Sequence, residues 1–179
     1  LVGVSNAFAE DAQSYIAEDI LNKTEIGQLY GGKREMDLEA LLAADPDVVI
    51  DIGQAKKSMA EDFDALTEQT GIPFIHIDAD VSTAAEAYRT LGKLISREEK
   101  AEKLASWCEN TYAGIQTLME KVDADNARKT LLYCLGEKGT NVIAEGSFHA
   151  QIVNLMSRNV AVIEDVVSSG DGNQVDLEQ

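Results

Sequence analysis

Polar and aromatic side chains follow three of the strands that the sequence predicts, at the point where each strand ends. Open α/β sheets bind ligands in the crevice at the carboxyl ends of their parallel strands. Side chains at these positions are therefore the candidate ligand-binding residues of this chain. They are Ser5, Asn6, Phe8, Asp51, Gln54, Ser147, Phe148 and His149.

Motifs that are typical of catalysis do not occur in the sequence. A phosphate-binding glycine loop would read GxGxxG or GxxxxGK[ST], and a nucleophile elbow would read GxSxG; none of the three is present. The two histidines, His76 and His149, do not form a recognised metal-binding spacing. His76 alternates with isoleucines inside a predicted strand, so we expect a structural role for it. A doubly wound α/β enzyme is the alternative from a different functional class.

The chain of 179 residues is strongly acidic, with a formal net charge of -17. This charge opposes binding to nucleic-acid phosphates and to anionic membrane surfaces, because no cluster of Lys and Arg compensates it. No apolar run approaches the ~20 residues that a membrane-spanning helix needs. Cys108 and Cys134 fall at apolar positions of predicted elements, and we expect two buried free thiols rather than a disulfide or a ligand pair.

One long, unbroken helix is predicted from residue 97 to residue 122. Ser96 and Glu99 have the spacing of a capping box, in which a hydroxyl and a carboxylate bond to backbone donors at a helix start. Apolar residues then recur at three- and four-residue steps as far as Val122, so Leu104 is expected on a buried face. At about 1.5 Å per residue the helix is roughly 39 Å long. This length exceeds what one small α/β lobe requires and suits a helix between two lobes.

Strands and helices alternate before the long helix. A short helix ends at Pro46, and a buried strand follows at 47–51. A helix with a second capping box spans 58–69, a strand spans 74–78, and a helix at 83–95 leads to the long one. Because a strand, a helix and a strand follow one another, we predict a parallel sheet with a right-handed crossover.

A second lobe is predicted after the long helix, where the buried strand 130–136 is followed by a short strand and a helix. We therefore divide the chain into an N-terminal lobe at 1–82, helices at 83–125, and the first part of a C-terminal lobe at 126–179.

A short sequence echo links the two lobes. Residues 36–40 and 175–179 both contain an apolar residue followed by Asp-Leu-Glu. The first copy continues through a helix into a core strand, whereas the sequence stops at the second. We therefore expect a strand to be missing after the second copy, and the unpaired sheet edge that remains predicts dimerisation or strand exchange.

The order of these segments resembles the helical-backbone substrate-binding proteins of ABC importers, in the branch for ferric siderophores, haem and cobalamin. The resemblance implies an α/β fold of two three-layer lobes with short parallel sheets, joined by one long backbone helix, with both lobes incomplete at the chain ends. It implies a receptor and no enzyme, with no cofactor beyond the bound ligand. The matching segments are LVGVS, DLEALLAADPDVVI, GIPFIHID, REEKAEKL, GSFHAQIVNLMSRNVA and VDLEQ.

The resemblance also implies functions for particular residues. In this family the ligand lies in the groove between the lobes, and the loop with Tyr30, Lys33 and Arg34 borders it. Lys33 and Arg34 could pair with a negatively charged ferric chelate. Glu39 and Glu178 match the exposed glutamates, one per lobe, that dock onto arginines of the membrane permease. The implied partners are a small metal chelate and an ABC permease. The implied location is outside the cytoplasm, in the periplasm or lipid-anchored at the outer face of the membrane.

Two other ligand classes are alternatives within the same superfamily. Cobalamin-binding members tend to place tryptophans in the groove, whereas Trp107 lies on the long helix, so a ferric siderophore or haem-like chelate is favoured. Binding proteins for bare zinc or manganese need several converging His and carboxylate ligands, and two histidines are few for that purpose.

Overall fold

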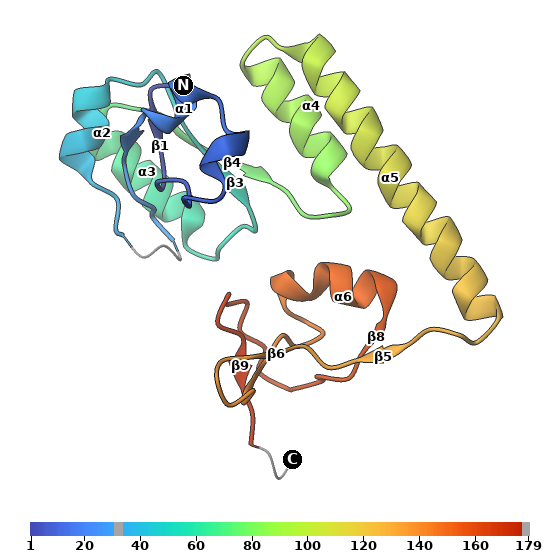
Figure 1. The fold of residues 1–179 in the computed structure, drawn as a ribbon. Helices are drawn as coiled ribbons and strands as arrows, with labels where there is room; N and C mark the ends of the chain where they lie inside the picture. The colour runs from blue at the N-terminus through green and yellow to red at the C-terminus, as the bar shows by residue number, and fades with distance from the viewer. Residues whose placement is uncertain (31–33, 177–179) are drawn as a thin grey trace. The chain divides into compact units, whose positions relative to one another are not determined.

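The computed structural model describes residues 1–30 and 34–176, so Lys33 and Glu178 lie outside the described residues. The fold is mixed α/β, with short parallel sheets and one long helix, as the sequence predicts (Figure 1). Contacts divide the chain into a first unit, Leu1–Asp51 with Ala55–His76, and a second unit, Ile52–Gln54 with Ile77–Gln179. The lobe boundaries at residues 82 and 125 stay predictions.

The first unit contains one short sheet and part of a second, whose strands continue past Asp51 and His76. Strands β1 (Gly3–Val4) and β2 (Thr24–Glu25) run parallel, and β3 (Val49–Gly53) pairs with β4 (Phe74–Asp78). At one end of the β3–β4 pair the N–H of Val49 donates to the Pro73 carbonyl at 2.9 Å, and at the other the N–H of Ala79 donates to the Gly53 carbonyl at 3.0 Å, so these strands also run in the same direction. The elements are β1 (Gly3–Val4), η1 (Gln13–Tyr15), α1 (Glu18–Leu21), β2 (Thr24–Glu25), α2 (Leu38–Ala44), β3 (Val49–Gly53), α3 (Met59–Thr70) and β4 (Phe74–Asp78).

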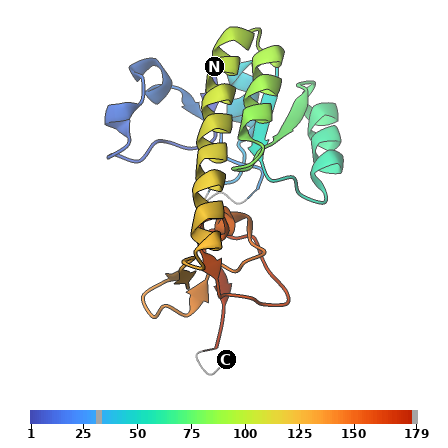
Figure 2. The same ribbon diagram turned by 90° about the vertical axis from the view of Figure 1, so that its right-hand side faces the viewer.

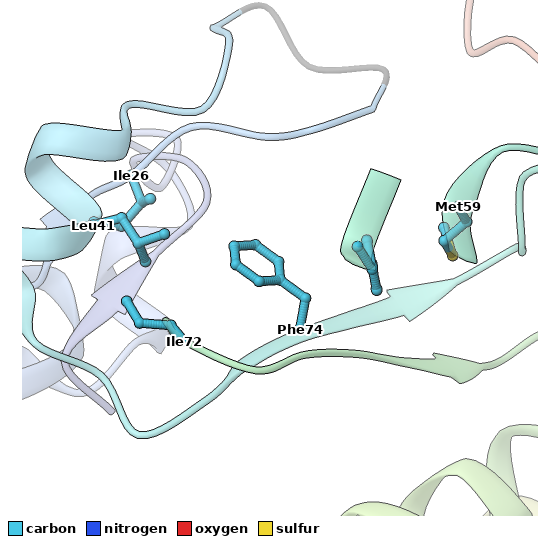
Figure 3. Close-up of a cluster of buried hydrophobic side chains, with 6 residues drawn as sticks. Ile26, Leu41, Met59, Ile72 and Phe74 are labelled. Carbon is cyan, nitrogen blue, oxygen red and sulfur yellow. The ribbon is translucent and has the colours of Figure 1, made fainter. Parts of the chain in front are cut away.

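The core of the first unit lies between these strands and the helices α2 and α3. Figure 3 shows how its side chains gather over β3 and β4. The rings of Phe63 and Phe74 pack at a tilt, with centroids 5.8 Å apart. Full burial of an apolar side chain of this size contributes about 1.5–3 kcal/mol to folding. The buried cluster consists of Ile26, Leu41, Met59, Phe63, Ile72 and Phe74.

Helices α2 and α3 of the first unit begin and end close to where the sequence predicts, but the start of α3 is not capped as expected. Asp37 caps α2 by accepting a hydrogen bond from the N–H of Ala40 at 3.0 Å. Helix α3 begins after Ser58 and ends at Gly71, which has a left-handed backbone conformation. Ser58 does not accept a capping bond. Its hydroxyl instead lies near the side chains of Tyr30 and Asp62, where it favours the ionised form of each and so acts to lower their pKa values. The predicted capping box at Ser58 is therefore wrong, although the helix start is right.

Helices α4 (Ala84–Leu94) and α5 (Glu98–Ala124) pack against each other in the second unit, as both views show (Figures 1 and 2). Helix α5 is one unbroken helix of 27 residues, which confirms the predicted long helix. The capping box predicted at Ser96 is wrong. Ser96 has a φ of 53°, and its N–H and that of Arg97 bond to the carbonyls of Lys93 and Gly92. Ser96 therefore closes the end of α4 and is not placed to cap α5.

The buried face of α5 is narrower than the sequence predicts. Ala101 and Ala105 face α4, and Met119 is buried further along the helix. Leu104 remains 37% exposed and Leu118 54% exposed, so the prediction that Leu104 lies on a buried face is wrong. Small residues face α4 because the two helices approach closely, and the longer apolar side chains therefore lie beside that contact.

The predicted buried strand 130–136 is wrong in two respects. It is divided into β5 (Thr130–Leu131), which pairs with β8 (Arg158–Asn159), and β6 (Cys134–Leu135), which joins a different, antiparallel sheet with β7 (Asn141–Val142) and β9 (Asn173–Gln174). The chain changes partner between the two strands, so one continuous strand cannot form. The segment is also largely exposed, including the free thiol of Cys134, which was expected to be buried.

Candidate ligand-binding site

In the first unit, Tyr30 belongs to a hydrogen-bonded cluster at the start of α3. Its hydroxyl donates to the carboxylate of Asp62. The pKa of Tyr30 is raised, first because of burial and second because of this bond. The pKa of Asp62 is lowered, mainly because Tyr30 donates to it. At neutral pH the pair is therefore a neutral phenol on a carboxylate, with the aromatic ring fixed in place.

Asp51 lies close to this cluster, and its negative charge contributes to the raised pKa of Tyr30. Its carboxylate also contacts Nδ1 of His76 on the neighbouring strand at 2.7 Å. The Asp51 side chain is 42% exposed, whereas that of His76 is 15% exposed. Tyr30 therefore lies near Asp51. The prediction that Asp51 follows its strand is wrong, because Asp51 is the middle residue of β3.

Arg34 lies on the surface, four positions after Tyr30 in the sequence. Its guanidinium contacts the carboxylates of Glu25 and Asp37, each at 3.5 Å, and the side chain is 49% exposed. Exposed ion pairs of this length contribute little to stability. An anionic ligand could therefore compete for the guanidinium at small cost.

The segment after β1 is hydrogen-bonded to Gly27, which lies three positions before Tyr30. The Ser5 carbonyl accepts a hydrogen bond from the N–H of Gly27 at 2.9 Å. Gly27 has a φ of 88°, and a Cβ there would lie 2.2 Å from the Glu35 carbonyl oxygen, so only glycine fits. Ser5 is exposed, while Asn6 and Phe8 are half-buried.

In the second unit, Ser147, Phe148 and His149 form a compact turn before α6 (Gln151–Met156), and the last two belong to the short helix η2 (Phe148–Ala150). The buried Ser147 accepts a bond from the N–H of His149 at 3.2 Å. The two aromatic rings meet edge to face, with centroids 5.8 Å apart and an angle of 89° between them. His149 is exposed and Phe148 half-buried. Together they present an aromatic surface. Gln54, also in this unit, is exposed.

Side chains that carry no signal of a binding role in the sequence hold Tyr30 and Phe148 in place. Ser58 and Asp62 hold Tyr30, but in the sequence they read only as first-turn residues of a helix. Ser168 accepts a bond from the N–H of Phe148 at 2.9 Å, and it is twenty positions away in a loop without a recognisable motif. Long-range hydrogen bonds of this kind leave no periodic signal in a single sequence.

Within residues 1–30 and 34–176, no group of three or more His, Cys, Asp or Glu side chains is arranged to hold a metal ion. In the same ranges, no helix has the length together with the apolar character that crossing a membrane requires.

Known structures share this fold. A solute-binding protein of an ABC transporter from Sulfurospirillum deleyianum has a TM-score of 0.83 at 22% identity, and the match covers 99% of this chain and 55% of that chain. A petrobactin-binding protein from Bacillus subtilis has a TM-score of 0.64 at 18% identity, covering 98% and 57%. A periplasmic haem-binding protein from Roseiflexus has a TM-score of 0.59 at 18% identity, covering 88% and 56%. No curated protein matches the chain significantly.

These neighbours are binding proteins rather than enzymes, and the chain spans between half and two thirds of the length of each. At such identities the likeness shows the fold. The sequence profile of the family described as "Periplasmic binding protein" matches residues 1–179. Because this match extends over the entire sequence, the chain belongs to the periplasmic binding protein family.

Proposed function

We propose that this chain is part of the substrate-binding component of an ABC importer, which captures an iron chelate outside the cytoplasm and delivers it to the membrane permease. The observation that carries the proposal is the family match over residues 1–179. The iron chelate is supported by two structural neighbours whose names specify petrobactin and haem. The proposed ligand is accordingly a ferric siderophore or a haem-like chelate.

The exposed groups of each unit suit such a ligand. Phe148 and His149 present aromatic surface that can cover a flat or aromatic chelate. Arg34, and Lys33 outside the described residues, supply positive charge for chelate carboxylates or for a negatively charged complex. Tyr30 adds a ring whose position is fixed by Asp62. In this proposal the ligand also contacts Ser5, Asn6, Phe8, Asp51 and Gln54, all of which except Phe8 are polar.

Docking to the permease is assigned to Glu39 and Glu178. Glu39 is exposed in the first turn of α2, where its carboxylate is available to a basic partner. Charge pairs at such surfaces fix the register of two proteins and speed their encounter. Replacing both glutamates with alanine should therefore reduce uptake by cells while chelate affinity in solution stays unchanged. Normal uptake by the double variant would rule out docking at these residues.

The ligand class can be tested by direct competition. The chain is incubated with hemin, a ferric tris-catecholate, cobalamin and zinc ions, and the bound fraction of each is measured by equilibrium dialysis. We expect the two iron chelates to bind more tightly than cobalamin or zinc. Tyr15→Ala, at an exposed aromatic residue outside the proposed site, should leave binding unchanged, whereas Phe148→Ala should weaken it. Tighter binding of cobalamin or zinc would overturn the proposed ligand class.

A further inference from the structure

The turn that carries Phe148 and His149 is bonded to two distant parts of the second unit. We call residues 147–151 the ligand loop. The N–H of Phe148 donates to Oγ of Ser168 at 2.9 Å. At the other end of the loop, Oε1 of Gln151 accepts a bond from the N–H of Val81 at 2.7 Å, across seventy positions of sequence. The loop is thus held at both ends by groups that do not belong to it.

Val81 belongs to a turn that is itself tightly organised. The Asp80 carboxylate accepts bonds from the N–H and the hydroxyl of Ser82, at 2.6 and 2.7 Å, and from the N–H of Thr83 at 2.8 Å. The N–H of Ala79 donates to the Gly53 carbonyl at 3.0 Å, so the turn is also fixed to the end of β3. Gln151 therefore connects the ligand loop to a rigid turn at the start of α4.

Ser168 is supported in a similar way. The buried side chain of Asn173 accepts a bond from the N–H of Val167 at 2.6 Å and donates to the Val167 carbonyl at 3.0 Å. These two bonds fix the backbone immediately before Ser168. The Ser168 hydroxyl is therefore presented to Phe148 from an ordered segment.

We infer that Gln151 and Ser168 are positioning residues, which hold the ligand loop in one conformation so that Phe148 and His149 keep their orientation. The inference rests on the proposed function, in which these two residues contact the ligand. A loop that is already ordered loses less conformational freedom when a ligand binds, and this raises affinity without a new contact. Neither Gln151 nor Ser168 needs to touch the ligand for this effect.

Conservative pairs of variants separate the hydrogen bond from the size of the side chain. Gln151→Glu keeps an oxygen that can accept from Val81, whereas Gln151→Met has similar length and no such acceptor. Ser168→Thr keeps the hydroxyl, and Ser168→Ala removes it. Gln116→Met is the matched control, since Gln116 is an exposed residue in α5 that is not part of the ligand loop. Thermal unfolding of every variant shows whether the fold is retained.

The first measurement is amide hydrogen exchange by NMR, which needs no ligand. Loss of one hydrogen bond should speed exchange at Val81 and across the ligand loop by about fivefold to tenfold in Gln151→Met. Ser168→Ala should do the same at Phe148. Gln151→Glu, Ser168→Thr and the control should keep exchange at the level of the unmodified chain. Unchanged exchange in Gln151→Met and Ser168→Ala would overturn the inference.

The second measurement is affinity for hemin and for a ferric tris-catecholate. We expect Gln151→Met and Ser168→Ala to weaken binding by about threefold to tenfold, with rescue in Gln151→Glu and Ser168→Thr. Faster loop exchange with unchanged affinity would show that the loop is held but does not serve the ligand, which also overturns the inference. If the unmodified chain binds neither chelate, the proposed function fails, and exchange alone decides whether these residues hold the loop.

Discussion

Ser96 has a backbone conformation that an L-residue adopts only at a cost. Its φ is 53°, in the left-handed region, because it closes α4 at the position where glycine is most common. Side chains in this region cost roughly 1–2 kcal/mol relative to the right-handed conformation. We therefore predict that Ser96→Gly stabilises the protein by about 1 kcal/mol, which corresponds to about 2–4 °C in Tm for a chain of this size.

Thermal unfolding checks this prediction. Ala113→Gly is a suitable control, because Ala113 is exposed within α5, where glycine should lower stability by about 1 kcal/mol. A decrease in Tm for Ser96→Gly similar to that of the control would show that Ser96 does not have the left-handed conformation.

Individual site residues could be predicted from the sequence only as far as their position after a strand. The sequence places Asp51 at the end of an apolar run, whereas β3 continues through it to Gly53. Ser147 to His149 lie between a predicted strand and helix. Their hydrogen-bonding partners could not be predicted, because Tyr30 with Asp62 and Phe148 with Ser168 are pairs that meet only after folding. Ser58 shows the same limit, since a serine before a helix reads as a cap whichever group its hydroxyl contacts.

At the scale of elements, the contact between α4 and α5 depends on Gly92. A Cβ at this position would lie 2.2 Å from the Cβ of Ala101, whereas a Cβ at Gly114 would meet nothing within 4 Å. Gly92→Ala should therefore destabilise the protein by about 1–3 kcal/mol through overpacking. Gly114→Ala should instead stabilise it by about 1 kcal/mol, because alanine favours the helix. Urea unfolding of the two variants measures both changes, and equal effects would contradict the close approach of the helices.

Salt bridges from Arg89 also join helices α4 and α5. The guanidinium of Arg89 on α4 bonds to Glu102 and Glu109 on α5, with distances between 2.6 and 3.0 Å. These bonds lower the pKa of Glu102 to about 2 and also lower the pKa of Glu109. The pKa of each glutamate is lower in the folded protein than its ordinary value. The salt bridges therefore stabilise the folded state fully at neutral pH, and this stabilisation is lost as the pH falls from about 4.5 toward 2.

We therefore predict that Arg89→Met lowers stability at pH 7 and that its difference from the unmodified chain shrinks toward pH 2. Lys103→Met is the control, because Lys103 pairs with Glu99 within α5 and both side chains are largely exposed. Urea unfolding across this pH range checks the prediction. A difference for Arg89→Met that is independent of pH would show that the arginine acts through packing and not through the two carboxylates.

Helices were predictable from the sequence to a greater extent than short strands. Helix α5 has a long periodic pattern, and α2 and α3 have clear start and stop residues, so their extents follow from local signals. The segment 130–136 has an equally apolar sequence, but its two halves join different sheets. Which strand pairs with which is decided by residues far along the chain, and an apolar run alone does not encode it.

For the whole molecule, the order of elements was informative where single motifs were weak. Alternating strands and helices around one long helix indicated the family, which the match over residues 1–179 shows. The ligand could not be derived in the same way. Its recognition depends on a few loop side chains, such as Arg34 and His149, whose chemistry suits more than one chelate.

The central claim is that the proposed site residues contact a ferric chelate, and the paramagnetism of the iron offers a direct test. High-spin Fe³⁺ broadens the NMR signals of nearby nuclei, so amide spectra are recorded with a ferric tris-catecholate and with its diamagnetic gallium analogue. We predict that iron selectively broadens the signals of Phe148 and His149, the aromatic residues of the turn before α6. Unbroadened signals at these two residues, or broadening located along α5 instead, would contradict the account.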